Sequence, residues 1–466
     1  MIEKIINTTN DALYSYILII LLVLGGIYFT IRTRFAQFRL LGQQIKSVTE
    51  KTNGKGVSSF QALMVSTASR VGTGNIIGVA TALCLGGFGS VFWMWGIALI
   101  GAASAFVEST LAQIFKKRGK DGGYGGPAYY IEAATKRKWL AVLFSVFLIL
   151  TYGCGFNMLA SYNLQSTFSS YSFYNATYTP WIVGFVIAVL VGYCLIGGGK
   201  RIVSVTGFLV PIMGGIYILV AIVISLLNVK LLPDLFRQIF ESAFDWEAIF
   251  GGFSGSCVMY GIKRGLFSNE AGVGSAPNAS ASAEVSHPAK QGLVQVLSVF
   301  IDTVLVCSAT AFMCMSSGLT PPTDSNQAAT YVQQSLSATL GQVGPIFVTV
   351  AMVFFAFTTL LGNLFYVDKT INYLLGREPS KTVRNLYYVA ASAVIFVGAG
   401  LSADLLWGIA DIMMGGMTLI NMPIILYLGK YAIRTLKHYE GQLKKGGKIA
   451  FRKEDIDLPY ETDYWN

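Results

Sequence analysis

The sequence is poor in charged residues. Charged side chains make up only 12% of its 466 residues, whereas 53% are hydrophobic. A soluble domain usually carries about twice that share of charge, which excludes a soluble fold. The net charge is +10, but the basic residues are concentrated in loops between apolar segments. This distribution is typical of membrane topology and argues against a nucleic-acid-binding protein.

Residues suited to catalysis or metal binding are also scarce. The two histidines, His287 and His438, lie near predicted membrane edges, and neither has a ligand partner in the sequence. The six cysteines lie in apolar segments without a Cys-x-x-Cys pair, which favours buried small side chains over a redox or metal role. No nucleophile–base set occurs at membrane depth. We therefore expect a protein that is not an enzyme and has no organic cofactor.

Eleven apolar segments are present, and each is long enough to cross a bilayer as a helix. They are residues 13–31, 57–86, 90–115, 139–168, 181–197, 202–227, 248–284, 291–317, 343–368, 383–400 and 404–428. The tail after Lys430 has mixed charge and no apolar run, so we expect a solvated helix followed by coil.

The distribution of Lys and Arg predicts the orientation in the membrane. If the N-terminus is outside, 28 of the 34 basic residues fall in inside loops and only 3 in outside loops. The outside loops 169–179 and 319–339 then contain none. If one segment too many or too few had been counted, the loops rich in Lys and Arg would fall on both sides of the membrane. We therefore predict a multi-pass protein of the cytoplasmic membrane, with the N-terminus outside and the C-terminus in the cytoplasm.

Two of the segments are interrupted at their centres. The first contains Arg70 followed by Gly72, Thr73, Gly74 and Asn75, and the second contains the run 265–277 with its glycines and polar residues. Arginine is costly at that depth, and glycines weaken a helix. In lipid, irregular backbone is tolerated only where protein buries it or where it lines a wet cavity. Close helix packing through glycine is the alternative, but it does not explain the charged residues.

Each interrupted segment opens a block of five segments. Because five is odd, the second block must have the opposite orientation in the membrane. An inverted repeat with a broken helix in each half is typical of secondary transporters. The predicted fold is an all-α integral membrane protein with eleven transmembrane helices. It comprises an extra N-terminal helix and cytoplasmic linker (1–56), a first five-helix repeat (57–229), a second, inverted repeat (247–429) and a cytoplasmic tail (430–466).

The ends of broken helices can bind both poles of an amino acid. Free N–H groups suit a carboxylate, and free carbonyls suit an amino group or Na⁺. The first break, which begins at Gly72, would offer the N–H groups of Thr73, Gly74 and Asn75. The carbonyls would come from Ala68 and Val71, and the opposing backbone from Phe267, Ser268 and Asn269. A zwitterion with a small side chain fits this pair of poles.

Two further features concern ions. Adjacent hydroxyls of Thr358 and Thr359 at mid-membrane suit a hard cation such as Na⁺, although each threonine could instead bond its own helix carbonyl. Next to two broken helices we favour the ion. Buried charges need partners, and Arg70 could pair with Glu108 or Glu270, between which the sequence does not choose. Asp302 could carry a proton, which keeps a proton-coupled alternative open.

The chain resembles the alanine/glycine:cation symporter family, also described as the sodium:alanine symporter family. The matching words are Arg70-Val-Gly-Thr-Gly-Asn-Ile76, Gly89-Ser-Val-Phe-Trp-Met-Trp95, Gly125-Gly-Pro-Ala-Tyr-Tyr-Ile131, Gly265-Leu-Phe-Ser-Asn-Glu-Ala-Gly-Val-Gly-Ser-Ala-Pro277, His287-Pro-Ala-Lys-Gln-Gly292 and Phe300-Ile-Asp-Thr303. The resemblance implies a leucine-transporter-like fold and Na⁺-coupled uptake of a small neutral amino acid by alternating access. It also implies that Thr73 and Gly74 meet the substrate carboxylate. The implied sodium ligands are Ala68, Val71, Phe355, Thr358 and Thr359.

The chain departs from the alanine-transporting members at the side-chain end of the pocket. By this resemblance, Ala160 occupies the position at which those members have a glutamine. Asn363 occupies the position at which they have a tryptophan. The pocket near Met158, Ala160 and Asn363 would be roomier, so alanine, glycine and glutamine all remain candidate substrates. A channel is a further alternative, but no ring of filter residues is visible. The expected partners are a small neutral amino acid, Na⁺ and the lipid bilayer, with no nucleic acid and no obligate protein partner.

Overall fold

The computed structural model describes residues 2–50, 56–119, 122–252 and 256–465. This part of the chain is mainly helical, with one short antiparallel hairpin formed by β1 (Lys117–Gly119) and β2 (Gly122–Tyr124). Residues 253–255 of the seventh predicted segment, and Lys51, Lys55 and Lys120 of the predicted inside loops, lie outside the described residues.

The helices of the first half follow the predicted segments closely. They are α1 (Ile2–Ala12), η1 (Leu13–Ile17), α2 (Leu18–Arg32), α3 (Ala36–Arg39), α4 (Leu41–Val48), α5 (Ser59–Arg70), η2 (Gly74–Gly78), α6 (Val79–Gly86), α7 (Gly89–Ile114), α8 (Pro127–Thr135), α9 (Lys138–Leu148), η3 (Ile149–Gly155), α10 (Phe156–Ser166), α11 (Thr179–Ile196), α12 (Gly198–Leu227), η4 (Val229–Leu231) and α13 (Leu232–Ala243).

The second half continues in the same manner. Its helices are α14 (Trp246–Gly251), α15 (Cys257–Asn269), α16 (Pro277–Ser282), α17 (Pro288–Val299), η6 (Phe300–Cys307), α18 (Ser308–Met315), η7 (Ser325–Gln327), α19 (Ala328–Leu340), α20 (Val343–Leu375), α21 (Lys381–Gly398), α22 (Ala403–Lys445) and η8 (Lys453–Ile456).

Eight helical runs in the described residues are long and apolar enough to cross a membrane. They are Thr8–Arg32, Gly89–Ile114, Lys138–Ser166, Thr179–Ile196, Gly198–Leu227, Pro288–Met315, Val343–Leu375 and Ala403–Lys445. Each coincides with one predicted segment, so the protein is a multi-pass membrane protein. The other three predicted segments are α21 and the two interrupted ones.

The first interrupted segment breaks where its sequence predicts. A capping box starts α5, because Gln61 N donates to Ser58 Oγ at 3.1 Å and Ser58 N donates to the Gln61 side chain at 2.9 Å. The helix ends at Arg70, and Val71 has non-helical torsions (φ −76°, ψ 87°). The chain becomes helical again in η2 and continues into α6. The predicted break is therefore confirmed.

The second interrupted segment breaks as well. Glu270 ends α15 in the left-handed conformation, with φ 53°. Residues 270–276 form turns, and Pro277 then starts α16 at a position where a proline's missing N–H costs nothing. Both breaks are buried inside protein, which is the condition for irregular backbone at membrane depth.

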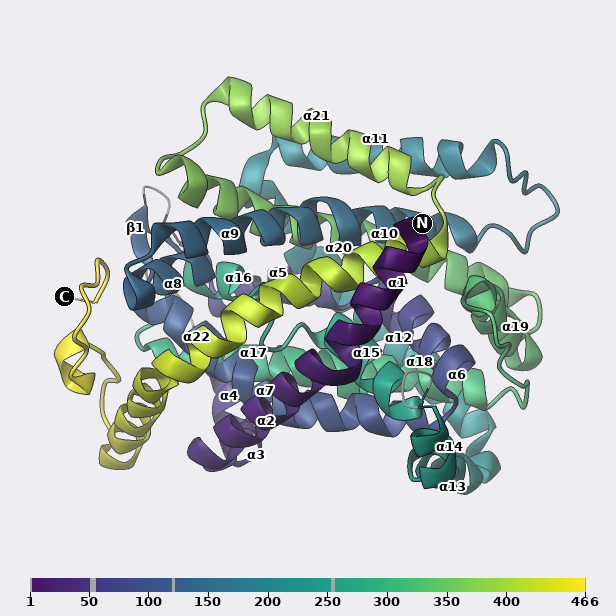
Figure 1. The fold of residues 1–466 in the computed structure, drawn as a ribbon, viewed down its shortest axis with the longest axis horizontal. Helices are drawn as coiled ribbons and strands as arrows, with labels where there is room; N and C mark the ends of the chain where they lie inside the picture. Colours follow the sequence, from purple (N-terminus) through teal and green to yellow (C-terminus); the bar gives the residue numbers. More distant parts are fainter. Residues whose placement is uncertain (1, 51–55, 120–121, 253–255, 466) are drawn as a thin grey trace.

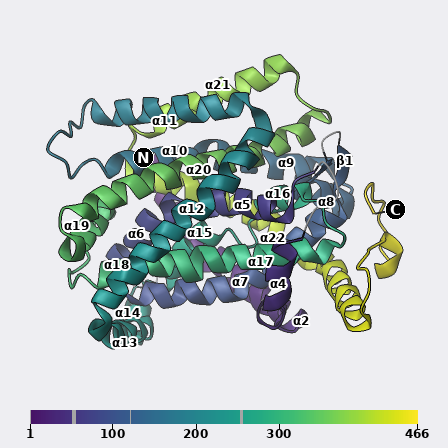
Figure 2. The same ribbon diagram turned by 180° about the vertical axis from the view of Figure 1, so that it is seen from behind.

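The helices pack around the two breaks. α15 and α17 lie against α7, while α12 and α20 lie against α5. α11 and α21 lie side by side at one edge of the molecule in both ribbon views (Figures 1 and 2). The breaks therefore lie among helices from both halves of the chain.

The short elements that connect the long helices lie at two opposite ends of the helix bundle (Figure 1). The hairpin, α8 and the C-terminal tail lie at one end, and α13, α14 and α19 lie at the other. The first set comes from predicted inside loops. In the second set, α13 and α19 come from predicted outside loops, and α14 includes the start of the predicted segment 248–284. The predicted outside loop 319–339 contains most of α19, in which Val332 and Leu336 are spaced one turn apart and form a buried face.

The two interrupted segments meet at the end that carries the hairpin. Val57, just before α5, forms a parallel bridge with Ala283, just after α16. Glu284 N donates to Val57 O at 2.9 Å. A Cβ on Gly56 would overlap the Glu284 side chain, so glycine is required for this approach. The start of one broken helix thus lies beside the end of the other.

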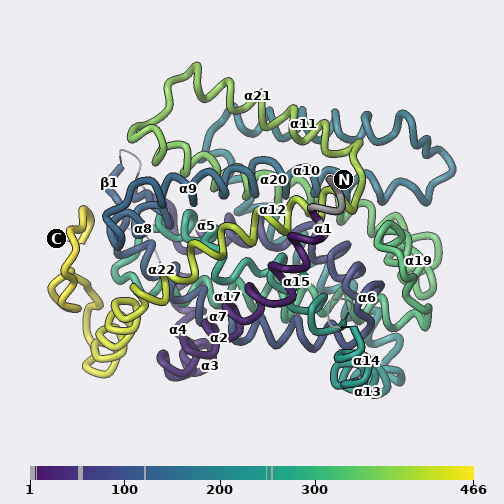
Figure 3. The backbone as a smooth tube through the Cα atoms, viewed as in Figure 1, coloured from purple at the N-terminus to yellow at the C-terminus, as the bar shows by residue number. Residues whose placement is uncertain are grey.

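The expectation of a solvated coil after the last helix is wrong. The tail folds back on the body of the protein, as the backbone trace shows (Figure 3). Trp465 is 7% exposed, and its Nε1 donates to Gln113 O at 2.6 Å. Tyr464 OH donates to Glu284 Oε2 at 2.6 Å, and the Lys116 ammonium lies 3.7 Å from the Tyr464 ring centre. Aromatic side chains, which composition alone did not single out, anchor the tail.

The two histidines partner each other, which the sequence did not predict. His287 Nε2 lies 3.3 Å from His438 Nδ1, although 151 residues separate them in the chain. Burial lowers the pKa of His287 to about 3, so this ring is neutral. Burial also lowers the pKa of Lys116 to about 7. Within the described ranges, no group of three or more His, Cys, Asp or Glu side chains gathers to hold a metal ion.

Candidate functional site

A small cavity lies where the first break faces Phe267 at the end of α15. Its volume is about 10 Å³, and it is lined by Ser69, Arg70, Gly72, Thr73, Gly74, Phe156, Phe267 and Thr359. This is roughly the room that one water needs. Five of these residues were predicted to belong to the site, whereas Phe156 was not. The structure therefore brings the first break, the second break and α20 together at one point.

The backbone of the first break has two unoccupied donors. Val71 N donates to Thr67 O at 2.7 Å, Asn75 N donates to Gly72 O at 3.1 Å, and Gly72 N donates to Asn75 Oδ1 at 2.8 Å. Among the described residues, the N–H groups of Thr73 and Gly74 donate no hydrogen bond to a backbone carbonyl. Both point out of the beginning of a helix, where the helix dipole favours an anion. The predicted donor Asn75 is already used within the break.

An aromatic wall closes the cavity on one side. The ring of Phe267 packs between Phe156 and Trp407, with ring centres 4.4 Å and 4.7 Å away. A Cβ on Gly74 would lie 2.8 Å from Phe267 Cε1, so the ring rests directly on the first break. The Arg264 guanidinium in turn lies 3.8 Å from the Trp407 ring centre. Phe156 and Trp407 were missed because aromatic residues in apolar helices carry no distinguishing pattern.

A buried ion cluster lies behind this wall. Lys263 Nζ is 2.9 Å from Asp411 Oδ2, and Arg264 Nη1 is 3.5 Å from Asp411 Oδ1. The three side chains are 10%, 4% and 1% exposed for Lys263, Arg264 and Asp411 respectively. Two cations of α15 thus share one carboxylate of α22. Lys263 and Arg264 lie in the predicted segment 248–284 and Asp411 in the segment 404–428, and the sequence alone does not pair them.

The two adjacent threonines of α20 have different surroundings. Thr359 Oγ1 is buried without a hydrogen-bond partner and lies so close to Gly72 that a Cβ there would overlap it. Thr358 Oγ1 lies 2.9 Å from Phe354 O and 3.2 Å from Phe355 O of its own helix. Thr358 therefore makes the local bond that was the alternative to an ion, while the Thr359 oxygen remains available.

Asn363 and Ser69 connect α20 with the breaks. Ser69 Oγ lies 2.6 Å from Asn363 Oδ1 and 3.2 Å from Glu270 Oε1. Asn363 Nδ2 donates to Asn157 Oδ1 at 2.9 Å. Both Asn363 and Asn157 are completely buried. The predicted site residue Asn363 thus belongs to a polar network that joins four elements, and it does not line the small cavity.

The remaining predicted residues do not face the cavity. Met158 packs against Gly398 of α21, Ala160 is buried within α10, and Asn269 Oδ1 accepts from Ala271 N at 3.0 Å. Asn75 and Ser268 turn toward Asp302. On α10 it is Phe156 that reaches the cavity, half a turn before Met158.

The buried Arg70 does not form the expected ion pair. Its Nη1 donates to Gln295 Oε1 at 2.9 Å, and in the described part of the chain no carboxylate lies within 4.0 Å of it. Glu108 instead accepts from Asn421 Nδ2 at 2.9 Å, and Glu270 accepts from Ser275 Oγ at 2.6 Å. Neither glutamate therefore forms a direct ion pair with Arg70, whose Nε and Nη2 are buried without a hydrogen-bond partner in the described residues.

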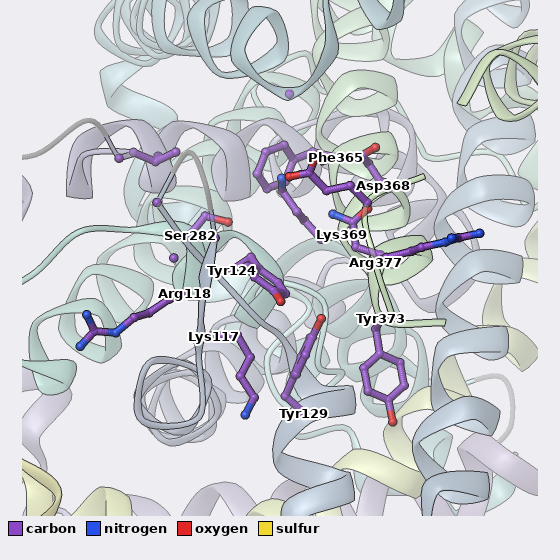
Figure 4. Close-up of a pocket in the computed structure, with 18 of the residues that line it drawn as sticks. Lys117, Arg118, Tyr124, Tyr129, Ser282, Phe365, Asp368, Lys369, Tyr373 and Arg377 are labelled. Atoms are coloured by element: carbon purple, nitrogen blue, oxygen red, sulfur yellow. Dashed lines mark ion pairs between the residues drawn. The ribbon is translucent and has the colours of Figure 1, made fainter. Parts of the chain in front are cut away.

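A much larger cavity opens at the end that carries the hairpin (Figure 4). Its volume is about 1710 Å³, and Val57 and Gln61 at the start of α5 are among its lining residues. Further lining residues are Lys117, Arg118, Tyr124, Tyr129, Ser282, Phe365, Asp368, Lys369, Tyr373 and Arg377. We refer to this cavity as the vestibule. The sequence did not reveal it, because its lining comes from several separate loops and helix ends.

Comparisons with known proteins agree with the motifs. Residues 1–453 match the sodium:alanine symporter family. The chain is 40% identical over 464 residues to the amino-acid carrier protein AlsT of Bacillus subtilis, covering 99% of this chain and 97% of that one. It is 40% identical over 470 residues to the probable sodium/glutamine symporter GlnT of Bacillus subtilis, covering 100% and 96%. It is 37% identical over 459 residues to the sodium/alanine symporter AgcS of Methanococcus maripaludis, covering 96% and 99%.

Proposed function

The chain belongs to the sodium:alanine symporter family, and we propose that it couples inward movement of Na⁺ to the uptake of a small neutral amino acid. One observation carries the proposal. Two backbone N–H groups without acceptors, at Thr73 and Gly74, lie at the same small cavity as the unpartnered hydroxyl of Thr359. An anion site and a cation site therefore adjoin where two broken helices meet. Relatives named for alanine and for glutamine leave alanine, glycine and glutamine as the candidates.

We also propose a leucine-transporter-like architecture. It has eleven transmembrane helices, with two inverted five-helix repeats (57–229 and 247–429) after one extra helix. The bridge between Val57 and Ala283 supports the opposite orientation of the repeats, because it brings the start of one broken helix to the end of the other. With the N-terminus outside and the C-terminus in the cytoplasm, the vestibule faces the cytoplasm. The site would open to each side in turn, by alternating access.

The substrate site requires rearrangement before it can accept an amino acid. A cavity of about 10 Å³ is far too small for one. We propose that the carboxylate binds the N–H groups of Thr73 and Gly74, and that the backbone of Phe267, Ser268 and Asn269 faces it. Movement of the Phe267 ring away from Gly74 would widen the cavity toward Met158, Ala160 and Asn363. Binding energy then stabilises the widened state.

The sodium site would use oxygen atoms of α5 and α20. We propose the carbonyls of Ala68, Val71 and Phe355 and the hydroxyls of Thr358 and Thr359, since Na⁺ prefers oxygen ligands. The unpartnered Thr359 oxygen fits this role as it stands. Thr358 must first give up the bond to its own helix. When bound, the ion supplies positive charge beside the carboxylate site.

Thr359→Val is expected to raise the Na⁺ concentration for half-maximal uptake about tenfold, because it removes an oxygen ligand worth roughly 1.4 kcal/mol. Thr358→Ala should raise this Na⁺ concentration less, because the wild-type Thr358 hydroxyl already donates a hydrogen bond to Phe354 O. Thr370→Val is the matched control, as Thr370 is a buried threonine of the same helix bonded to Tyr366 O. Na⁺ activation curves in proteoliposomes measure all three. An unchanged curve for Thr359→Val would remove the Thr359 hydroxyl from the site.

Transport in proteoliposomes tests the function itself. Uptake of labelled alanine, glycine and glutamine is measured with an inward Na⁺ gradient, with a pH gradient, or with neither. We expect saturable uptake of at least one of the three, driven by Na⁺ alone. Uptake driven by the pH gradient and indifferent to Na⁺ would instead establish the proton-coupled alternative. Conduction without saturation would establish a channel.

A further inference from the structure

Asp302 receives a hydrogen bond from each of the two broken helices. It lies in η6, next to the breaks, and is completely buried. Asn75 Nδ2, from the first break, donates to Asp302 Oδ1 at 2.7 Å. Ser268 Oγ, from the end of α15, donates to Asp302 Oδ2 at 2.8 Å. One carboxylate of a third helix thus joins the two breaks.

The chemistry of a carboxylate fixes the orientation of the Asn75 amide. Both oxygens of Asp302 accept hydrogen bonds, Oδ2 from the Ser268 and Thr303 hydroxyls and Oδ1 from Asn75 Nδ2, so the NH₂ group of Asn75 faces Asp302. The amide oxygen then necessarily faces the other way, and it accepts from Gly72 N at 2.8 Å. If the amide were turned round, its NH₂ group would face the Gly72 N–H, and its oxygen would face the carboxylate. Both contacts would be repulsive.

Asp302 therefore influences which backbone donors of the first break are free. The Asn75 amide occupies the Gly72 N–H, and Thr310 Oγ1 donates to Asn75 O at 2.6 Å. The N–H groups of Thr73 and Gly74 are left without acceptors. We propose that Asp302 is a positioning residue, which acts through Asn75 on the first break and through Ser268 on the second. It holds both in the geometry that presents these N–H groups to the substrate carboxylate. This inference rests on the proposed function.

Exchanging the two side chains tests the proposal. Asn75→Asp places two carboxylates in contact, and Asp302→Asn replaces one of the two oxygens that accept from Asn75, Ser268 and Thr303 with an NH₂ group, so each is expected to raise the KM for the amino acid about tenfold or more. In the double variant, the new carboxylate at position 75 accepts from both Gly72 N and the new amide at position 302. The oxygen of that amide still accepts from Ser268. We expect the double variant to recover part of the lost affinity, with Vmax changed less than KM. Recovery is incomplete because the carboxylate at position 75 still faces the main-chain oxygen of residue 302, to which Asn75 Nδ2 donates at 3.1 Å in the wild type.

Two hydroxyls on the same carboxylate oxygen provide the matched control. Ser268 Oγ and Thr303 Oγ1 lie 2.8 Å and 2.7 Å from Asp302 Oδ2. Ser268 lies at the end of α15, directly before the second break, whereas Thr303 is the chain neighbour of Asp302. We expect Ser268→Ala to raise KM several-fold and Thr303→Val to leave it within about twofold. If the two variants raised KM equally, the Asp302 carboxylate would need hydrogen-bond donors of any origin, and the proposal would be wrong.

The same variants can be compared without transport. Thermal unfolding in detergent gives a double-mutant cycle for Asn75 and Asp302, in which the exchange should be more stable than either single variant. A cycle with additive losses, or a double variant with the KM of the single variants, overturns the proposal. If wild-type protein shows no Na⁺-driven uptake, the proposed function fails instead, and the unfolding cycle still decides the Asn75–Asp302 pairing.

Discussion

Replacing Gly72 with alanine is expected to lower Na⁺-driven uptake roughly 100-fold, the effect of an overpacking cost of about 3 kcal/mol at the site. The new Cβ would overlap Thr359 Oγ1, the free oxygen at the small cavity. Separating α5 from α20 cannot relieve the overlap cheaply, because the two helices touch again nearby. There, a Cβ on Gly362 would lie 2.6 Å from Ser69 N. Uptake of labelled amino acid in proteoliposomes, normalised to protein, measures the loss.

Gly78→Ala is the matched control for this prediction. Gly78 lies in η2, six residues later, and a Cβ there would be 3.5 Å from Trp407 Cη2, an ordinary contact. We expect uptake within about twofold of wild type. Size-exclusion profiles should show that both variants are folded. If Gly72→Ala transported as well as Gly78→Ala, the close approach of Gly72 and Thr359 would not matter for function.

Asp411→Asn is expected to lower the free energy of unfolding by about 3–5 kcal/mol, the usual cost of leaving a buried charge without its partner. Among the described residues, Asp411 is the one carboxylate within 4.0 Å of Lys263 or Arg264. The amide keeps the shape of the side chain but removes the charge that both cations share. Reversible unfolding in mixed micelles measures the change.

An exposed ion pair provides the comparison for Asp411→Asn. Arg237 Nε lies 3.7 Å from Glu241 Oε1, and both side chains are 67% exposed. Glu241→Gln should change the free energy of unfolding by less than about 1 kcal/mol, because water already screens this pair. Similar losses for Glu241→Gln and Asp411→Asn would mean that burial does not strengthen the Asp411 cluster.

Local signals made the membrane helices predictable. A long apolar run is visible without knowledge of its neighbours, and so is a break such as Gly72–Thr73–Gly74 within one. The eight long apolar helices and the two interruptions followed from these signals alone. The distribution of basic residues similarly predicted which loops share an end of the molecule.

Contacts between distant segments were not predictable in the same way. Arg70 had two acidic candidates in the sequence, yet it bonds the neutral Gln295, because many polar groups compete inside the bundle. Phe156 and Trp407 form the cavity wall only through the packing of α10 and α22 against α15. Met158 and Ala160 were placed by analogy, and their helix turns them away from the cavity in this conformation. Their role in binding, like that of the proposed sodium ligands, stays a prediction.

The bridge between the two broken helices has a consequence for observing this protein at work. Any movement that parts Val57 from Glu284 must break the bond between Glu284 N and Val57 O. The Glu284 amide proton then loses its acceptor and can exchange with deuterium from water. The hydrogen-exchange rate of this single backbone amide therefore reports how often the two helix ends separate.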